Sequence, residues 1–78
     1  MIELYCVSYY ESNDTDSHTK EYFQMNQKRN ATTIARRTSK LSGHDSFIWN
    51  CKGFYVDDVF NEVEATHVAT YRNGKKQK

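Results

Sequence analysis

The chain has 78 residues, no proline and a hydrophobic fraction of 37%, with six tyrosines, four phenylalanines and one tryptophan. This length supports one domain with a small core in which aromatic side chains supply much of the apolar surface. The formal net charge is only +1, and no apolar run reaches the length of a membrane span. The first ten residues lack the basic segment and cleavage site of a signal peptide, so we expect a cytoplasmic protein.

The N-terminal third has the pattern of a β-hairpin. Residues 2–10 alternate in a way that predicts a strand covered on both faces. One face has Ile2, Leu4 and Cys6, and the other has Tyr5, Val7 and Tyr9. Residues 11–19 are rich in Asp, Asn, Ser and Thr and are typical of a loop, and residues 20–26 resume a strand.

Residues 30–43 predict one short amphipathic helix. Asn30 is a suitable N-cap, and Gly43 stands where a left-handed residue ends a helix. The side that we expect to face the sheet consists of Ala31, Ile34, Ala35, Thr38 and Leu41. The opposite face consists of Arg29, Thr33, Arg36 and Lys40, with Arg37 at its border.

The C-terminal half adds two or three strands. Residues 45–51, 53–60 and 64–72 have strand composition, although Val59, Phe60 and Val63 could instead lie on a short helical turn capped by Asp57 or Asp58. The predicted fold is α+β, an antiparallel sheet of four to five strands with one amphipathic helix packed across one face, in the order β-β-α-β-β(-β). We assign residues 1–72 to one compact domain and residues 73–78 to a basic C-terminal tail.

Charge is arranged in blocks of alternating sign. Residues 20–44 have a net charge of +5 and residues 45–66 a net charge of −4. Residues 72–78 contain four basic residues and no acidic residue. A basic block attracts phosphate backbones or acidic protein surfaces, and the acidic blocks would repel a phosphate chain. The two-signed surface therefore favours protein recognition over plain nucleic-acid binding.

Catalytic and metal-binding patterns are weak. Ser42, His44, Asp45 and Ser46 are nearly contiguous in one loop, whereas a catalytic relay needs side chains that converge from a scaffold. The histidines and cysteines lack metal-ligand spacing, so we predict no enzyme activity, no metal and no cofactor. Cys6 and Cys51 fall on predicted strands, and we expect two buried reduced thiols rather than one disulfide.

Four tyrosines could line an exposed sheet face. Tyrosines on such a face, flanked by basic residues, can stack on single-stranded bases. The simpler interpretation is that they cover the sheet of a core-poor domain, with a protein-contact role for some of them. The residues concerned are Tyr5, Tyr9, Tyr22 and Tyr55.

The strand leading into a basic helix, "KEYFQMNQKRNATTIARRTSKL", and the closing "HVATYRNGKK" resemble the layout of small phage-encoded inhibitors. Among these, the resemblance is to anti-CRISPR proteins that act on type I surveillance complexes, and it covers most of the chain as a pattern. It implies stoichiometric binding to a bacterial effector and obstruction of its nucleic-acid site. The location it implies is the host cytoplasm.

We therefore predict a non-enzymatic phage or mobile-element protein that inhibits a host nucleic-acid-handling complex of the CRISPR type by direct binding. The expected contact residues are Arg29, Arg36, Arg37 and Lys40, with Arg72, Lys75 and Lys76 as a secondary set. The alternative is a small DNA- or RNA-binding regulator that uses the same helix on phosphates. A third possibility is an assembly subunit, a homodimer joined through an exposed strand edge; the expected state is monomer or homodimer.

Overall fold

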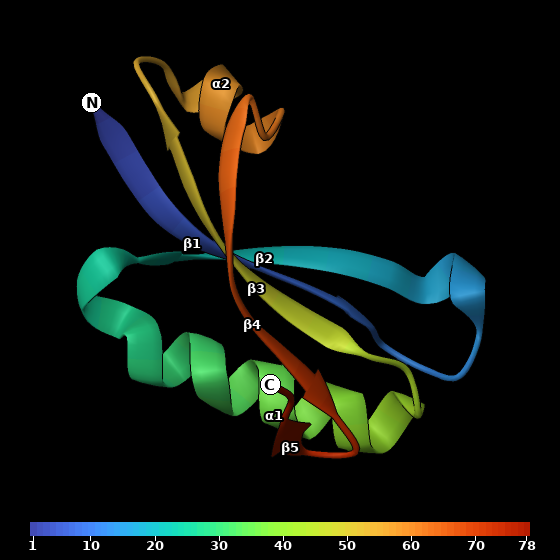
Figure 1. Ribbon diagram of the computed structural model, residues 1–78. Helices are drawn as coiled ribbons and strands as arrows, with labels where there is room; N and C mark the ends of the chain where they lie inside the picture. The colour runs from blue at the N-terminus through green and yellow to red at the C-terminus, as the bar shows by residue number, and fades with distance from the viewer.

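The computed structural model describes residues 1–78 and contains one antiparallel five-stranded sheet with the strand order β2-β1-β3-β4-β5 (Figure 1). Its strands are β1 (Ile2–Tyr10), β2 (His18–Gln24), β3 (Ser46–Gly53), β4 (Glu64–Arg72) and β5 (Lys75–Lys76). Helix α1 (Lys28–Ser42) covers one face of the sheet, and the short helix α2 (Val56–Phe60) lies over the opposite face (Figure 1). This arrangement confirms the predicted α+β fold.

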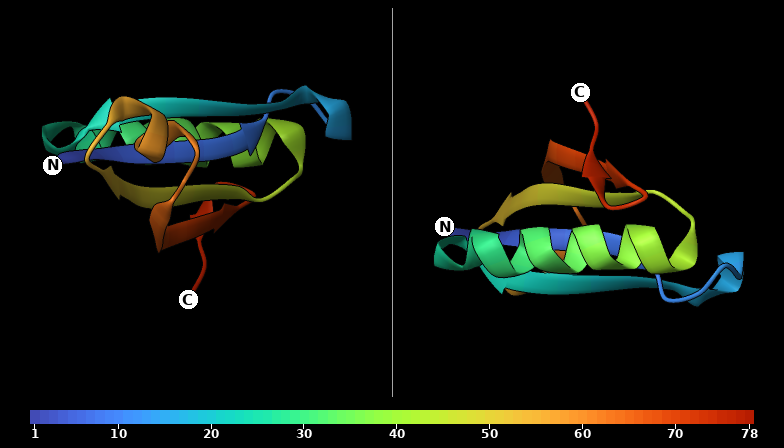
Figure 2. Two further views of the ribbon diagram at one scale, coloured as in Figure 1. Left: turned by 90° about the horizontal axis from the view of Figure 1, so that it is seen from above. Right: turned by 90° about the horizontal axis from the view of Figure 1, so that it is seen from below.

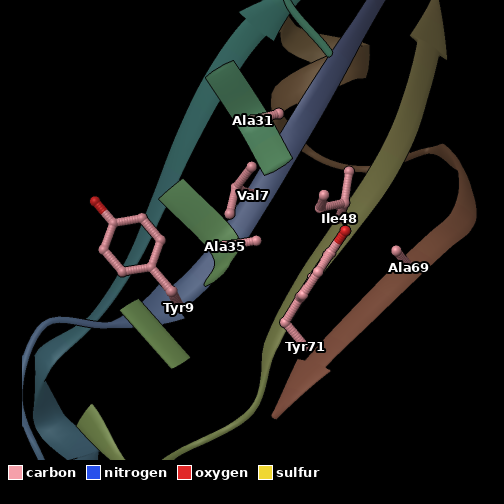
Figure 3. Close-up of a cluster of buried hydrophobic side chains, with 7 residues drawn as sticks. All are labelled: Val7, Tyr9, Ala31, Ala35, Ile48, Ala69 and Tyr71. Atoms are coloured by element: carbon pink, nitrogen blue, oxygen red, sulfur yellow. The ribbon is translucent and has the colours of Figure 1, made fainter. Parts of the chain in front are cut away.

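The main core lies between the sheet and α1 (Figure 3). Helix α1 runs along the sheet over β1 and β3, as the right view of Figure 2 shows. The residues that it buries against the sheet include two alanines, whose small side chains allow the helix to lie close to the strands. The alternation predicted for β1 is confirmed, because Val7 and Tyr9 contribute to this cluster. The buried residues of the cluster are Val7, Tyr9, Ala31, Ala35, Ile48, Ala69 and Tyr71.

A second, smaller core lies on the other face of the sheet, beneath α2. Cys6, Cys51 and Val59 are fully buried there, and Val59 belongs to α2 itself. Ile2, Leu4, Tyr22 and Trp49 pack around them. The strand β1 is thus covered on both faces, as its alternation predicts.

Helix α1 begins earlier than the sequence predicts. A 3-10 turn at Met25–Gln27 leads directly into the helix at Lys28, and the Gln27 side chain accepts a hydrogen bond of 3.0 Å from the Gln24 amide. The prediction that Asn30 caps the helix is therefore wrong, because Asn30 lies inside the first turn. The predicted end is confirmed, since Gly43 is left-handed with φ 76°.

The buried side of α1 is narrower and more polar than predicted. Leu41, expected to face the sheet, is 75% exposed. The serines Ser39 and Ser42 are buried instead, next to the alanines along the helix. Thr38 lies beside the sheet, where its hydroxyl is 2.8 Å from the hydroxyl of Ser46 on β3. Small hydroxyl side chains fit the short distance between α1 and the sheet, whereas Leu41 lies at the end of the helix.

Val59 and Phe60 lie on the short helix α2, as the helical alternative predicts, whereas Val63 lies beyond it. The prediction that Asp57 or Asp58 caps this helix is wrong, because Tyr55 is the N-cap and both aspartates lie in the first turn. The turn is held by Asp58, whose Oδ2 accepts a hydrogen bond of 3.1 Å from the Tyr55 amide. Gly53 allows the chain to fold back here, because a Cβ atom on it would lie 2.4 Å from the Cβ of Asp58.

The segment after Arg72 is part of the sheet. Asn73 and Gly74 both have positive φ values, 52° and 81°, and form the tight turn of a hairpin that pairs β5 with the end of β4. The Gly74 amide donates a hydrogen bond of 2.9 Å to the buried hydroxyl of Ser39. The expected tail at 73–78 thus begins as a strand that is attached to α1.

Candidate binding surface

Helix α1 carries five exposed cations, which we call the α1 basic face. Its residues are Lys28, Arg29, Arg36, Arg37 and Lys40, and all are exposed. Four of them lie on the outer side of α1, whereas Lys28 lies at the N-terminal end, in line with the buried Ala31 and Ala35. Four of these residues are those predicted from the sequence. The prediction omitted Lys28 because it began the helix at Asn30, whereas the helix begins at Lys28. Glutamine is not a typical N-cap residue, so Gln27 did not indicate this earlier start.

None of these five side chains forms an ion pair. The only three ion pairs of the molecule are Lys20–Glu62, Lys52–Glu3 and Arg72–Asp45. Lys28 and Arg29 also lie in the first turn of α1, which contains no acidic residue. The positive end of the helix dipole disfavours cations at that position, so the local structure gains nothing from them. The α1 basic face is therefore an uncompensated positive surface.

Two residues of the α1 basic face also contact the rest of the domain. The guanidinium of Arg36 lies 5.6 Å from the centre of the Tyr71 ring, a cation–π contact with β4. The aliphatic part of Lys40 lies against Gly74, where an added Cβ would be 3.7 Å from the Lys40 Cβ and Cδ atoms. Arg29 and Arg37 form neither an ion pair nor a cation–π contact.

The three secondary residues do not form one patch with α1. Arg72 is paired with Asp45 through two hydrogen bonds of 2.9 and 3.0 Å, which lower the pKa of Asp45. Lys76 stands opposite Tyr71 in the β4–β5 register, on the same face as α1, while Lys75 stands opposite Arg72 on the other face. The structure thus places Lys76 toward the α1 basic face and separates Arg72 and Lys75 from it.

The acidic blocks lie elsewhere on the surface. Glu11, Asp14 and Asp16 occupy the β1–β2 connection, and Asp57 and Asp58 lie on α2. None of these carboxylates is in an ion pair. Helices α1 and α2 lie on opposite faces of the sheet, so the molecule presents separate basic and acidic regions.

The segment around α2 exposes large apolar side chains. Phe54, Tyr55 and Val63 are 76%, 74% and 71% exposed. The segment is nevertheless held in place, because Phe60 packs on Tyr22 with ring centres 4.8 Å apart and Glu62 bonds to Lys20 at 2.8 Å. A fixed segment with exposed aromatic side chains is typical of a contact surface.

The four tyrosines considered for base stacking do not share a face. Tyr9 is buried in the cluster under α1 and Tyr5 packs against that cluster. Tyr22 lies on the opposite face with Cys6, and Tyr55 lies on the exposed segment before α2. The structure therefore contradicts a common tyrosine surface, because alternate residues of β1 point toward α1.

The side chains of the loop sequence 42–46 each have separate partners. The Ser42 hydroxyl accepts a hydrogen bond from the His44 amide, and the ring of His44 hydrogen-bonds to the Asn13 carbonyl at 2.9 Å. Asp45 pairs with Arg72. No cluster of three or more His, Cys, Asp or Glu side chains is placed to hold a metal ion, and the surface contains no pocket.

The two cysteines are free and fully buried on adjacent strands. Burial raises the pKa of the Cys6 thiol to about 11 and also raises that of Cys51. Both groups therefore hold their protons at neutral pH, as expected of buried reduced thiols.

Comparison of the chain with protein-family models, with curated proteins and with solved structures finds no match. No helix of the molecule is both long and apolar enough to cross a membrane.

Proposed function

We propose that the protein is a small non-enzymatic phage or mobile-element protein that binds and inhibits a host nucleic-acid-handling complex, such as a CRISPR-type defence complex. The α1 basic face supplies its main contact. The observation that supports this proposal is that five cations on one rigid helix have no acidic partner anywhere on the chain. Such a surface attracts a polyanion or an acidic protein surface.

The helix carrying these cations is well anchored. Ala31, Ala35 and Ser39 fix α1 to the sheet, so the cations are presented from a rigid element rather than from a loop. A preorganised surface loses less conformational entropy on binding. The separate acidic region near α2 favours a protein or nucleoprotein partner over naked nucleic acid, since two-signed surfaces select partners by charge complementarity.

The experiment is a pull-down from bacterial lysate with the tagged chain, with and without nuclease, followed by identification and purification of the retained complex. A multi-subunit complex that is retained after nuclease treatment and inhibited by the purified chain would support the proposal. The variant Arg29→Glu/Arg37→Glu should then lose binding with little loss of thermal stability, because neither arginine forms an ion pair or a cation–π contact. Retained affinity in this variant would remove α1 from the mechanism.

The charge-matched control is Lys20→Glu/Lys52→Glu. It lowers the net charge by the same amount but changes cations that lie off α1 and already have acidic partners. If both variants lose affinity equally, net charge alone drives the binding and the α1 basic face has no special role.

A regulator that binds DNA or RNA phosphates is the second candidate. Lys28 and Arg29 favour it, because a helix N-terminus with adjacent cations suits a phosphate group. Titration of duplex DNA against salt tests it, since the slope of log K against log salt is about −0.9 for each phosphate contact. A steep slope that Arg29→Glu/Arg37→Glu reduces by about two contacts would favour this candidate.

A further inference from the structure

Large apolar side chains are exposed around α2, where the fold itself does not use them. Five of the seven large hydrophobic residues that are exposed in the whole chain lie within residues 54–63. In this segment only Val59 is buried, and it completes the second core. So dense a group of exposed apolar side chains indicates a contact that the chain does not make by itself. We call this group the α2 apolar surface; its residues are Phe54, Tyr55, Val56, Phe60 and Val63.

Backbone hydrogen bonds bring the two ends of the α2 apolar surface together. The Asp58 amide donates to the Tyr55 carbonyl at 3.1 Å, and the Val63 amide donates to the Asp58 carbonyl at 3.1 Å. The residues before and after α2 therefore meet at one residue of the helix. The contact of Phe60 with Tyr22 holds the helix to the sheet. A surface that is fixed in this way loses little conformational entropy when a partner binds.

The same segment carries unpaired negative charge. Residues 53–63 contain Asp57, Asp58 and Glu62 and no basic residue. Glu62 is neutralised by Lys20, whereas neither aspartate is in an ion pair. Asp57 is exposed and comes two residues before the buried Val59, so at about 100° per residue it points away from the sheet. The α2 apolar surface is thus accompanied by an outward-pointing carboxylate.

We propose that the α2 apolar surface binds a protein partner through a basic and apolar surface of that partner, in which Lys or Arg side chains lie beside aliphatic ones. The aspartates of α2 repel nucleic-acid phosphates and anionic lipid headgroups, but they complement a cationic protein surface. The molecule has no pocket for a small ligand. Exposed aromatic side chains, by contrast, are enriched where proteins contact one another.

This binding surface is separate from the α1 basic face. Helix α2 lies over the face of the sheet opposite to α1 (Figure 1). The two surfaces have opposite charge and therefore select contacting surfaces of opposite charge. Binding at α2 does not require that the α1 basic face binds its proposed partner.

The test uses a synthetic helical peptide with a stripe of leucines flanked by lysines, titrated into the isotope-labelled chain and followed by amide chemical shifts. Saturable shifts are expected at Tyr55, Asp57 and Val63, and none along α1, which repels the lysines of the peptide. A peptide with glutamate in place of lysine should not bind, and one with serine in place of leucine should bind about tenfold more weakly. No binding of the leucine–lysine peptide, or shifts centred outside residues 54–63, would overturn the proposal.

The variant Tyr55→Ser/Val63→Ser tests the apolar contribution. It should weaken binding of the leucine–lysine peptide about tenfold. Thermal stability should change little, because both side chains are exposed and serine suits the N-cap position that Tyr55 occupies. Leu41→Ser is the matched control, since Leu41 is an exposed apolar residue of α1, and it should leave the affinity unchanged. Equal affinity of Tyr55→Ser/Val63→Ser and the unmodified chain would contradict the proposal.

The variant Asp57→Asn tests the electrostatic contribution. The affinity for the leucine–lysine peptide should fall several-fold at low salt and depend less on salt. Asp16→Asn is the control, because Asp16 is an exposed carboxylate of the β1–β2 connection that is also in no ion pair. An equal loss in both variants would show that only net charge matters and would overturn the role of α2.

Three further measurements distinguish other occupants of the same surface. Sedimentation velocity of the chain alone tests a second copy, and titration with duplex DNA or with phosphatidylserine vesicles tests a nucleic acid and a membrane. Each should give no effect that depends on Tyr55 and Val63. Self-association, DNA binding or vesicle binding that Tyr55→Ser/Val63→Ser abolishes would assign the α2 apolar surface to that occupant and overturn the proposal.

Discussion

The Gly74 amide donates a hydrogen bond of 2.9 Å to the hydroxyl of Ser39, a side chain that is completely buried on α1. This bond joins the turn between β4 and β5 to the helix that carries the basic face. The Ser39 hydroxyl in turn donates to the Arg36 carbonyl at 2.9 Å. One hydroxyl therefore satisfies two backbone groups and ties the C-terminal hairpin to α1.

Ser39→Ala should lower the free energy of unfolding by about 1–2 kcal/mol, because it leaves the Gly74 amide without its acceptor. Chemical denaturation measures the loss, and hydrogen exchange of the Gly74 amide localises it. The matched control is Ser42→Ala, since Ser42 is also buried on α1 but bonds only within its own loop. Unchanged exchange at Gly74 in Ser39→Ala would show that the bond does not hold the hairpin.

Gly53→Ala should destabilise the domain by about 1–3 kcal/mol, because the new Cβ would lie 2.4 Å from the Cβ of Asp58 and α2 would have to shift. Gly43→Ala is the comparison. Gly43 is left-handed with φ 76° but has no atom within 4 Å of its Cβ position, so only backbone strain of about 1 kcal/mol applies. Thermal unfolding of both variants measures the difference, and an equal loss would mean that α2 moves freely.

The domain should lose stability in alkaline solution. Burial raises the pKa of Cys6 from 9.0 to about 11 and that of Tyr22 from 10.0 to about 12. Above pH 9 the unfolded chain therefore releases protons that the folded chain retains, and the free energy of unfolding falls as the pH rises. Tm should stay level below about pH 9 and fall between about pH 9 and 12.

The double variant Cys6→Ala/Tyr22→Phe removes both groups and should flatten this fall. Its Tm at neutral pH serves as the reference for any packing change. A Tm of the unmodified chain that rises above pH 9 would contradict the assignment of buried, protonated groups.

Arg72→Gln should weaken partner binding less than Arg37→Gln. Arg72 is already paired with Asp45, whereas Arg37 has no acidic partner. The pair lowers the pKa of Asp45, so the stability that it contributes is present above the usual carboxyl pKa and is lost as the pH falls through the lowered value. The Arg72 side chain is 60% exposed, so solvent screens the pair and its contribution to stability is small. Titration of the partner with both variants compares them, and a larger effect of Arg72→Gln would reassign the main contact to β4.

Local patterns in the sequence were sufficient for the class of fold and for most of the basic face. The alternation in β1 predicts two covered faces because neighbouring side chains of a strand point in opposite directions, and the structure shows both cores. The helical spacing of Arg29, Arg36 and Lys40 likewise predicts their common exposed side. The turn signal Asn73-Gly74 was also present, and it marks the hairpin that the prediction treated as a tail.

Contacts between distant segments were decided only by the tertiary structure. Leu41 is exposed and Ser39 is buried because the position of α1 over the sheet, and the hairpin attached to it, determine which residues are covered. Arg72 pairs with Asp45, which is distant from it in the sequence, so no local pattern predicts this ion pair. The sequence by itself determined which residues share a face of each element, since this follows from backbone geometry. Which faces meet, which charges are neutralised and which edge of the sheet stays open depend on how the elements pack together.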